Sequence, residues 1–114
     1  MTQSLLFALL MAGAYQEAQD ILCANFPDKA PYIRQIAPPT VGFKSRSWID
    51  WRHLVWARGH TKLFASPNVK VSLAGGFKKV YYRLRHEFFH WIIFNTTITE
   101  KAHDWVDHYW RHGT

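Results

Sequence analysis

The chain of 114 residues is long enough to bury one hydrophobic core and leaves little room for another, so we expect a single domain over residues 1–114. A hydrophobic share of 48% and an aromatic share of 17% exclude an intrinsically disordered protein. Fourteen Lys and Arg residues against eight Asp and Glu give a formal net charge of +6, which favours contact with a polyanion such as nucleic acid. The single cysteine, Cys23, excludes an internal disulfide and a cysteine-based zinc finger, and it fits a reducing compartment.

The apolar run from Leu5 to Ala14 is the candidate for a signal peptide or a membrane segment. No Lys or Arg precedes this run, and the helical period continues without a break through Gln16 to Phe26, which argues against a cleaved signal peptide. The run is also shorter than the roughly 20 apolar residues that span a bilayer. We therefore expect a cytoplasmic protein that does not enter a membrane, with a signal peptide as the alternative.

The first expected element is an amphipathic helix from about Ser4 to Asn25. Its apolar residues recur with a period close to 3.6 and its polar residues fall on the opposite face, so we expect it to cover a sheet. Pro27 and Pro31 end the helical pattern. Residues 37–40, which include two prolines, are expected to form an extended connector.

Beyond this connector the helical period disappears, and β-branched and aromatic residues predict a small antiparallel sheet of about three strands. A first strand lies within Thr40–Ser47, although Ser45–His53 can instead form a helical turn. Leu54–Trp56 and Leu63–Ala65 are expected to be the arms of a hairpin that turns at Gly59. We expect a peptide substrate to pair with the exposed edge of this sheet through backbone hydrogen bonds.

A last strand and a long helix follow. Val69–Leu73 alternates apolar and polar residues as a half-buried strand does, and Gly75 and Gly76 end it. Phe77 to about Asn95 has the pattern of the longest helix, whose second half is apolar nearly all round. The sequence therefore predicts an α+β fold: an N-terminal helix, the small sheet, this helix and a C-terminal helix.

The long helix contains the sequence HExxH. The five residues are His86, Glu87, Phe88, Phe89 and His90. Residues four apart on a helix share a face, so the two imidazoles can bind one zinc ion, and the adjacent Glu87 can act as general base in peptide hydrolysis. The competing interpretation is that both histidines are ordinary helix residues, because the composition alone gives the motif in roughly 1% of shuffled chains.

A third ligand is expected on the C-terminal helix, because catalytic zinc takes three protein ligands and leaves one position open. Thr97 followed by Glu100 is a capping box, which predicts that this helix runs from about Ile98 to Arg111. His103 is the preferred third ligand, thirteen residues after His90. Glu100 and Asp107 are the competing ligands, and Asp107 can otherwise accept a hydrogen bond from His103.

This arrangement resembles the SprT-like (Spartan-type) zinc metalloproteases. The resemblance rests on the HExxH residues, on the hydrophobic Trp91–Phe94 and on His103, and it covers roughly residues 41–112. The order of a helix, a small sheet and then the motif helix is also similar. It implies a minimal zincin-like catalytic domain with His86, His90 and His103 as zinc ligands and Glu87 as general base, acting on protein or peptide substrates, including DNA-associated proteins. Two features differ from many members: Asp104 stands where they have glycine, and the cysteines of their zinc ribbon are missing.

Basic residues interleaved with tryptophans are candidates for contact with DNA. The candidate residues are Lys44, Arg46, Arg52, Arg58, Lys62, Lys78 and Lys79. Arg83 and Arg85 extend the same basic stretch, and the bland interpretation is a solvated surface over a tryptophan core. The alternative to an enzyme is a small basic module that binds nucleic acid or protein, for example an inhibitor, with a structural or catalytically silent zinc site.

Overall fold

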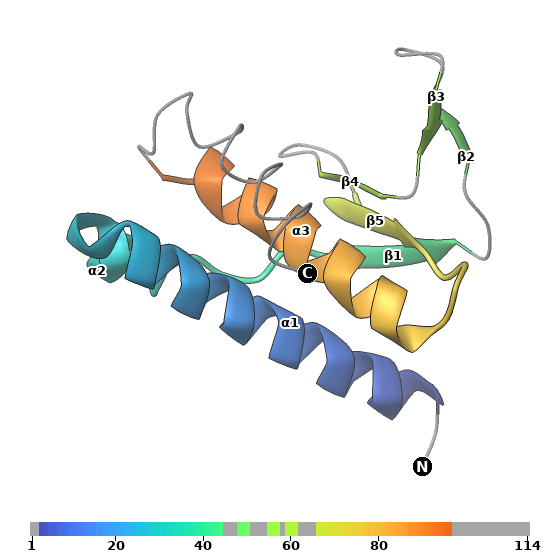
Figure 1. Ribbon diagram of the computed structural model, residues 1–114, viewed down its shortest axis with the longest axis horizontal. Helices are drawn as coiled ribbons and strands as arrows, with labels where there is room; N and C mark the ends of the chain where they lie inside the picture. Colours follow the sequence, from blue (N-terminus) through green and yellow to red (C-terminus); the bar gives the residue numbers. More distant parts are fainter. Residues whose placement is uncertain (1–2, 45–47, 51–54, 58, 62–65, 97–114) are drawn as a thin grey trace.

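The computed structural model describes residues 3–44, 48–50, 55–57, 59–61 and 66–96 (Figure 1). It combines helices with strands, which confirms the expected α+β class. The elements follow one another in the order α1 (Gln3–Asn25), the short 3-10 helix η1 (Pro27–Lys29), α2 (Ala30–Ile33), β1 (Val41–Lys44), β2 (Trp48–Asp50), β3 (Val55–Ala57), β4 (Gly59–Thr61), β5 (Val69–Ser72) and α3 (Phe77–Phe94).

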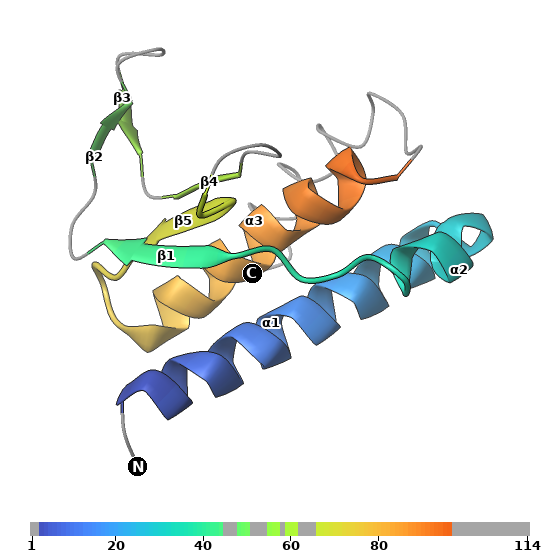
Figure 2. The same cartoon turned by 180° about the vertical axis from the view of Figure 1, so that it is seen from behind.

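Helix α1 confirms the expected N-terminal helix and packs along α3, which in turn contacts β4 and β5 (Figures 1 and 2). Ala14, Ala18 and Leu22 are spaced by four residues and form a fully buried stripe on one face of α1. Near the start of α1, the ring of Phe7 stacks on Phe43 of β1 with 4.8 Å between centroids. The helix therefore reaches the sheet at its N-terminal end and covers α3 along its length.

The segment between α1 and the sheet is held in place by both long helices. Pro27 has no backbone N–H to continue α1, and η1 and α2 follow before the chain becomes extended. The Tyr15 hydroxyl donates to the carbonyl oxygen of Ile36 at 2.7 Å, and the Trp91 indole N–H donates to that of Ala37 at 2.9 Å. These two bonds fix the point at which the chain enters β1 relative to α3.

The main sheet has the strand order β1-β5-β4 and mixes strand directions. The expected first strand within Thr40–Ser47 is confirmed as β1, which runs parallel to β5 with Val41 opposite Val69. Strand β4 is antiparallel to β5, with Gly59 opposite Val71. The expectation of a purely antiparallel sheet is therefore wrong. The described residues between β1 and β5 include β2, β3 and β4, and β5 lies beside β1 in the same direction.

The expected hairpin with its turn at Gly59 is also wrong. Gly59 begins β4, which pairs with β5, whereas the expected arm Leu54–Trp56 overlaps β3, which pairs with β2. Within the range Ser45–His53, the described residues Trp48–Asp50 form strand β2 and not a helical turn. The other arm, Leu63–Ala65, lies outside the described residues. A glycine inside a strand can serve close packing rather than a turn, and at Gly59 it does so against α3.

Helix α3 begins directly after two glycines and carries the HExxH residues. Gly75 and Gly76 have φ angles of 93° and 90°, which other residues rarely adopt, and they confirm the expected break before the helix. Along α3, Val80, Leu84 and Phe88 are spaced by four residues and are buried in the core. This buried face fixes the rotation of α3 about its axis, and so it also fixes the directions in which the residues on its other faces point.

Buried cations tie α3 to its neighbours. The guanidinium of Arg83 donates to the carbonyl oxygen of Ser72 at 2.8 Å, at the end of β5. Arg85 forms an ion pair with Glu17 of α1, and the Tyr81 hydroxyl donates to the same carboxylate. Both arginines therefore serve contacts between elements.

The expected C-terminal helix, Ile98–Arg111, lies outside the described residues, as does the capping box of Thr97 and Glu100. Within the described part of the chain, none of the helices combines the length and the apolar character that crossing a membrane requires. The last described element is α3, so the geometry of the candidate site is that of α3 and of the strands against it.

Candidate metal centre

The structure brings His86 and His90 together on α3. Their Nε2 atoms are 3.2 Å apart and their ring centroids 4.8 Å apart, as the helical spacing of four residues predicts. Zinc bound to two imidazoles at about 2.0–2.1 Å in a tetrahedral site separates the two nitrogens by about 3.3–3.4 Å. The pair therefore fits two positions of a zinc site. In the metal-free protein the same distance allows one ring to donate its N–H to the other.

The histidine pair lies at the border between the core and the surface. His90 is 8% exposed, and its ring centroid is 5.8 Å from that of Phe94 one turn further along α3. His86 is half-buried. Because Phe88, Phe89 and Ile92 point into the core, the face that carries the histidines is left at the edge of the packed region.

Glu87 turns its side chain towards β4. The Thr61 hydroxyl lies 2.8 Å from Glu87 Oε1 and 3.0 Å from the Glu87 main-chain oxygen, as a hydrogen-bond donor. The residue is 8% exposed, and burial raises the pKa of its carboxyl to about 7, although the hydrogen bond from Thr61 lowers it in part. Gly59, also on β4, lies near the other carboxylate oxygen: a Cβ at this position would be 2.8 Å from Glu87 Oε2.

Thr61 and Gly59 are site residues that the sequence did not indicate. A strand of three residues carries too little alternation to be recognised, and a glycine between two short apolar segments favours a turn. Nothing in the sequence around Thr61 points to Glu87, which is 26 residues away along the chain. Their contact arises from the way β4 lies against α3.

The third zinc ligand is not placed by the described residues. His103 and its competitors Glu100 and Asp107 all lie outside them. Within the described part of the chain, no group of three or more His, Cys, Asp and Glu side chains comes together in a way that could hold a metal ion. The described residues thus show the imidazole pair, while Glu87, the next residue after His86, directs its carboxylate to β4.

The basic candidates are divided between described and undescribed residues. Lys44 is exposed at the end of β1, and Lys78 and Lys79 are exposed in the first turn of α3. Arg46, Arg52, Arg58 and Lys62 lie outside the described residues. The inclusion of Arg83 and Arg85 in a basic surface is wrong, because both are buried and bonded to neighbouring elements.

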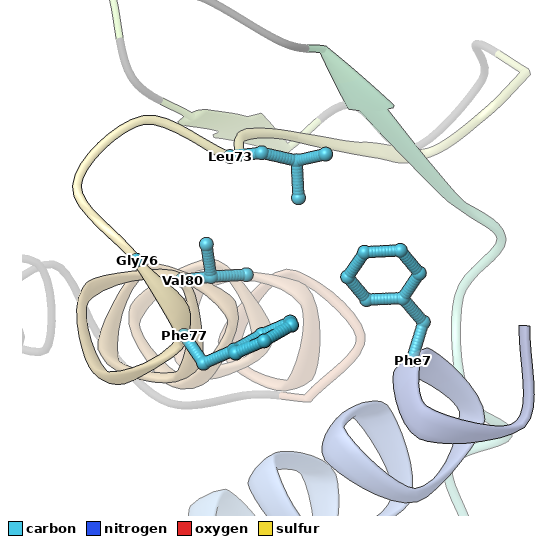
Figure 3. Close-up of a pocket in the computed structure, with 5 residues that line it drawn as sticks. All are labelled: Phe7, Leu73, Gly76, Phe77 and Val80. Carbon is cyan, nitrogen blue, oxygen red and sulfur yellow. The ribbon is translucent and has the colours of Figure 1, made fainter. Parts of the chain in front are cut away.

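A separate apolar pocket of about 170 Å³ lies where α1, the end of β5 and the start of α3 meet (Figure 3). Its lining consists of Phe7, Leu73, Gly76, Phe77 and Val80. None of these side chains can titrate or bind a metal, so the pocket offers apolar contact alone. His86 follows Phe77 by more than two helical turns, which separates this pocket from the candidate metal centre.

No protein-family model matches the chain, and comparison with curated proteins and with solved structures gave no match either. The resemblance to SprT-like proteases therefore remains a prediction from the motif.

Proposed function

We propose that the chain is a zinc-dependent endopeptidase, a minimal zincin-like domain of the SprT type that acts in the cytoplasm. His86 and His90 supply two zinc ligands, and His103 supplies the third. The observation that carries the proposal is the separation of 3.2 Å between the two Nε2 atoms of His86 and His90, with the carboxylic acid Glu87 as the residue after His86. Two imidazole ligands one helical turn apart, with a glutamate after the first as general base, are the pattern of a hydrolytic zinc site.

In this proposal Glu87 handles the proton. When bound, zinc supplies a Lewis acid that polarises the substrate carbonyl and makes water more acidic. Glu87 accepts a proton from the attacking water and then delivers it to the leaving amine. Its position directly after His86 on the helix keeps it next to the metal ligands, and Thr61 limits where its carboxylate can turn.

The edge of the sheet supports the choice of a peptide as substrate. Strand β4 is at the end of the strand order β1-β5-β4, and its residues Gly59 and Thr61 contact Glu87. An extended peptide that pairs with the outer side of β4 through its backbone would run past Glu87. Backbone pairing accepts many sequences, so selectivity has to come from what brings a substrate to the site.

DNA is the proposed means of bringing substrates to the enzyme. The net charge of +6 and the exposed Lys44, Lys78 and Lys79 support contact with phosphates. In this proposal, Arg46, Arg52, Arg58 and Lys62 add to the same surface, and the substrates are proteins bound to DNA.

Zinc content and cleavage together test the proposal. We expect one zinc ion per chain in the purified protein, and its loss in His86→Ala, His90→Ala and His103→Ala, each measured by elemental analysis. We expect cleavage of labelled casein by the wild-type protein and its loss on treatment with a chelator. Glu87→Gln preserves the shape of the side chain but cannot accept a proton, so it should bind zinc and cleave nothing.

A second candidate is a small basic module that binds nucleic acid or protein, for example an inhibitor, with a structural or silent zinc site. The burial of Glu87 favours it, because a general base has to reach water. Zinc bound at His86 and His90 without any cleavage would support this candidate. Casein cleavage that stops in Glu87→Gln would exclude it.

A further inference from the structure

Strand β4 faces both oxygens of the Glu87 carboxylate, with Thr61 at Oε1 and Gly59 at Oε2. Thr61 Oγ1 lies 2.8 Å from Oε1, and Gly59 lies so close to Oε2 that an added Cβ would approach it to 2.8 Å. Alternate residues of a strand share a face, so Gly59 and Thr61 both face α3. The strand thus offers a donor to one carboxylate oxygen and leaves space, through the missing side chain, for the other.

The Thr61 hydroxyl can serve Glu87 throughout a proton-transfer cycle. It has one proton to donate, and two acceptor oxygens of Glu87 lie within reach, Oε1 at 2.8 Å and the main-chain oxygen at 3.0 Å. The ionised carboxylate accepts the hydroxyl proton. Once Glu87 has taken a proton from water on Oε2, Oε1 is the carbonyl oxygen of the neutral acid and still accepts the hydroxyl proton of Thr61. Neither state requires the backbone to move.

We propose that Thr61 is a positioning residue for the general base, and that Gly59 leaves the space which the positioned carboxylate occupies. This inference rests on the proposed peptidase function, because positioning has a meaning only if Glu87 transfers a proton. A carboxylate held at a fixed angle needs no rearrangement before it accepts that proton. A bond with a purely structural role would contribute to stability and leave the rate of the chemical step unchanged.

The test compares three threonine variants of the full, zinc-loaded chain. Thr61→Val removes the hydroxyl and keeps the shape of the side chain, whereas Thr61→Ser keeps the hydroxyl. Thr40→Val is the matched control. The Thr40 hydroxyl also makes two hydrogen bonds, donating to Asn68 Oδ1 at 3.0 Å and accepting from the Asn68 N–H at 2.9 Å, but it lies just before β1, which β5 separates from β4. The measurements are kcat and KM on labelled casein, zinc per chain and the thermal midpoint.

We expect Thr61→Val to lower kcat by roughly 10- to 100-fold with KM and zinc content unchanged, as loss of a supporting hydrogen bond does at hydrolytic sites. Thr61→Ser should restore most of this loss. Thr40→Val removes an exposed hydroxyl, so it should lower the thermal midpoint less and leave kcat unchanged. This contrast separates positioning from stability.

Other outcomes overturn the inference in distinguishable ways. An active wild type with equal kcat in Thr61→Val and Thr40→Val removes the positioning role and leaves the peptidase standing. Loss of zinc from Thr61→Val also removes it, because the effect would then be on metal binding. An inactive wild type overturns the proposed function and this inference together. If Thr61→Val fails to fold, Gly59→Ala carries the test: it displaces Oε2, and an unchanged kcat in that variant overturns the inference.

Discussion

The carboxyl group of Glu87 lies in surroundings that favour its neutral form. Burial raises its pKa from 4.5 to about 7, and the hydrogen bond from Thr61 opposes only part of this rise. A glutamine at this position would fill the same space without a charge to bury. The acid therefore lowers the stability of the metal-free protein at neutral pH, and a role as proton acceptor gives a reason for its presence.

In the metal-free protein we expect Glu87→Gln to raise the free energy of unfolding at pH 8 by about 3 kcal/mol. The folded pKa of about 7 lies above the ordinary value of 4.5, so the stability that the protonated group contributes is complete below pH 4.5 and is lost as the pH rises through 7. Wild type and variant should therefore have similar stabilities at pH 4. Urea denaturation in the presence of a chelator measures both values.

The control for this change of charge is Asp28→Asn, which alters an exposed acid on η1. It should leave the free energy of unfolding nearly the same at both pH values. A gain in Glu87→Gln that is equal at pH 4 and pH 8 would contradict the pKa argument, because it would then come from packing alone.

At the residue scale, the contact between the two histidines can be predicted from the sequence, whereas the residues that contact Glu87 cannot. Helical geometry alone places residues four apart on one face, so His86 and His90 could be predicted to meet once the helix was recognised. Gly59 and Thr61 meet Glu87 through tertiary packing across a separation of 26 residues between Thr61 and Glu87. Local patterns carry no information about such a contact.

Among the elements, the direction of α3 depends on the turn that joins it to β5. Gly76 has φ 90° and ψ 172°, a conformation that is essentially restricted to glycine, and an added Cβ would meet nothing within 4 Å. We expect Gly76→Ala to lower the free energy of unfolding by roughly 1–3 kcal/mol, purely from backbone strain. Urea denaturation of the variant and the wild type measures the difference.

Gly13 in α1 is the matched control for this substitution. It lies inside a helix, and an added Cβ would stand at an ordinary distance of 3.8 Å from Tyr81. Gly13→Ala should therefore raise the free energy of unfolding, by roughly 0.5–1 kcal/mol, because alanine favours helices more than glycine does. If the two variants changed stability in the same direction, the strain assigned to Gly76 would be absent.

The long elements could be predicted from the sequence, whereas the pairing of the short strands could not. Helices α1 and α3 have many turns over which their period is visible, and the prolines and glycines at their ends mark the boundaries. Strands β2, β3 and β4 have three residues each, too few for a pattern to select a partner. The parallel pairing of β1 with β5 brings Val41 opposite Val69, and no local pattern in either strand selects a partner so far along the chain.

On the scale of the whole molecule, the exposed charge is less than the composition suggests. Arg83 and Arg85 count towards the net charge of +6, but they are buried between elements. Lys78 and Lys79 remain exposed at the start of α3. The described lysines of the proposed DNA-contacting surface on α3 therefore lie at its start, about two helical turns before His86.

We expect the double variant Lys78→Ala/Lys79→Ala to bind a short DNA duplex more weakly than the wild type does. Each lysine that contacts a phosphate releases a counterion, so the slope of log affinity against log salt should fall in magnitude by up to about 2. The control is Lys29→Ala/Arg34→Ala, at the opposite end of the molecule beside η1 and α2 (Figure 1). Both double variants remove two positive charges. Fluorescence anisotropy distinguishes the two double variants when it is measured between 50 and 200 mM salt, the range over which such contacts weaken strongly. Equal losses of affinity would assign the binding to net charge. No loss of affinity in Lys78→Ala/Lys79→Ala would remove this surface from the proposed function.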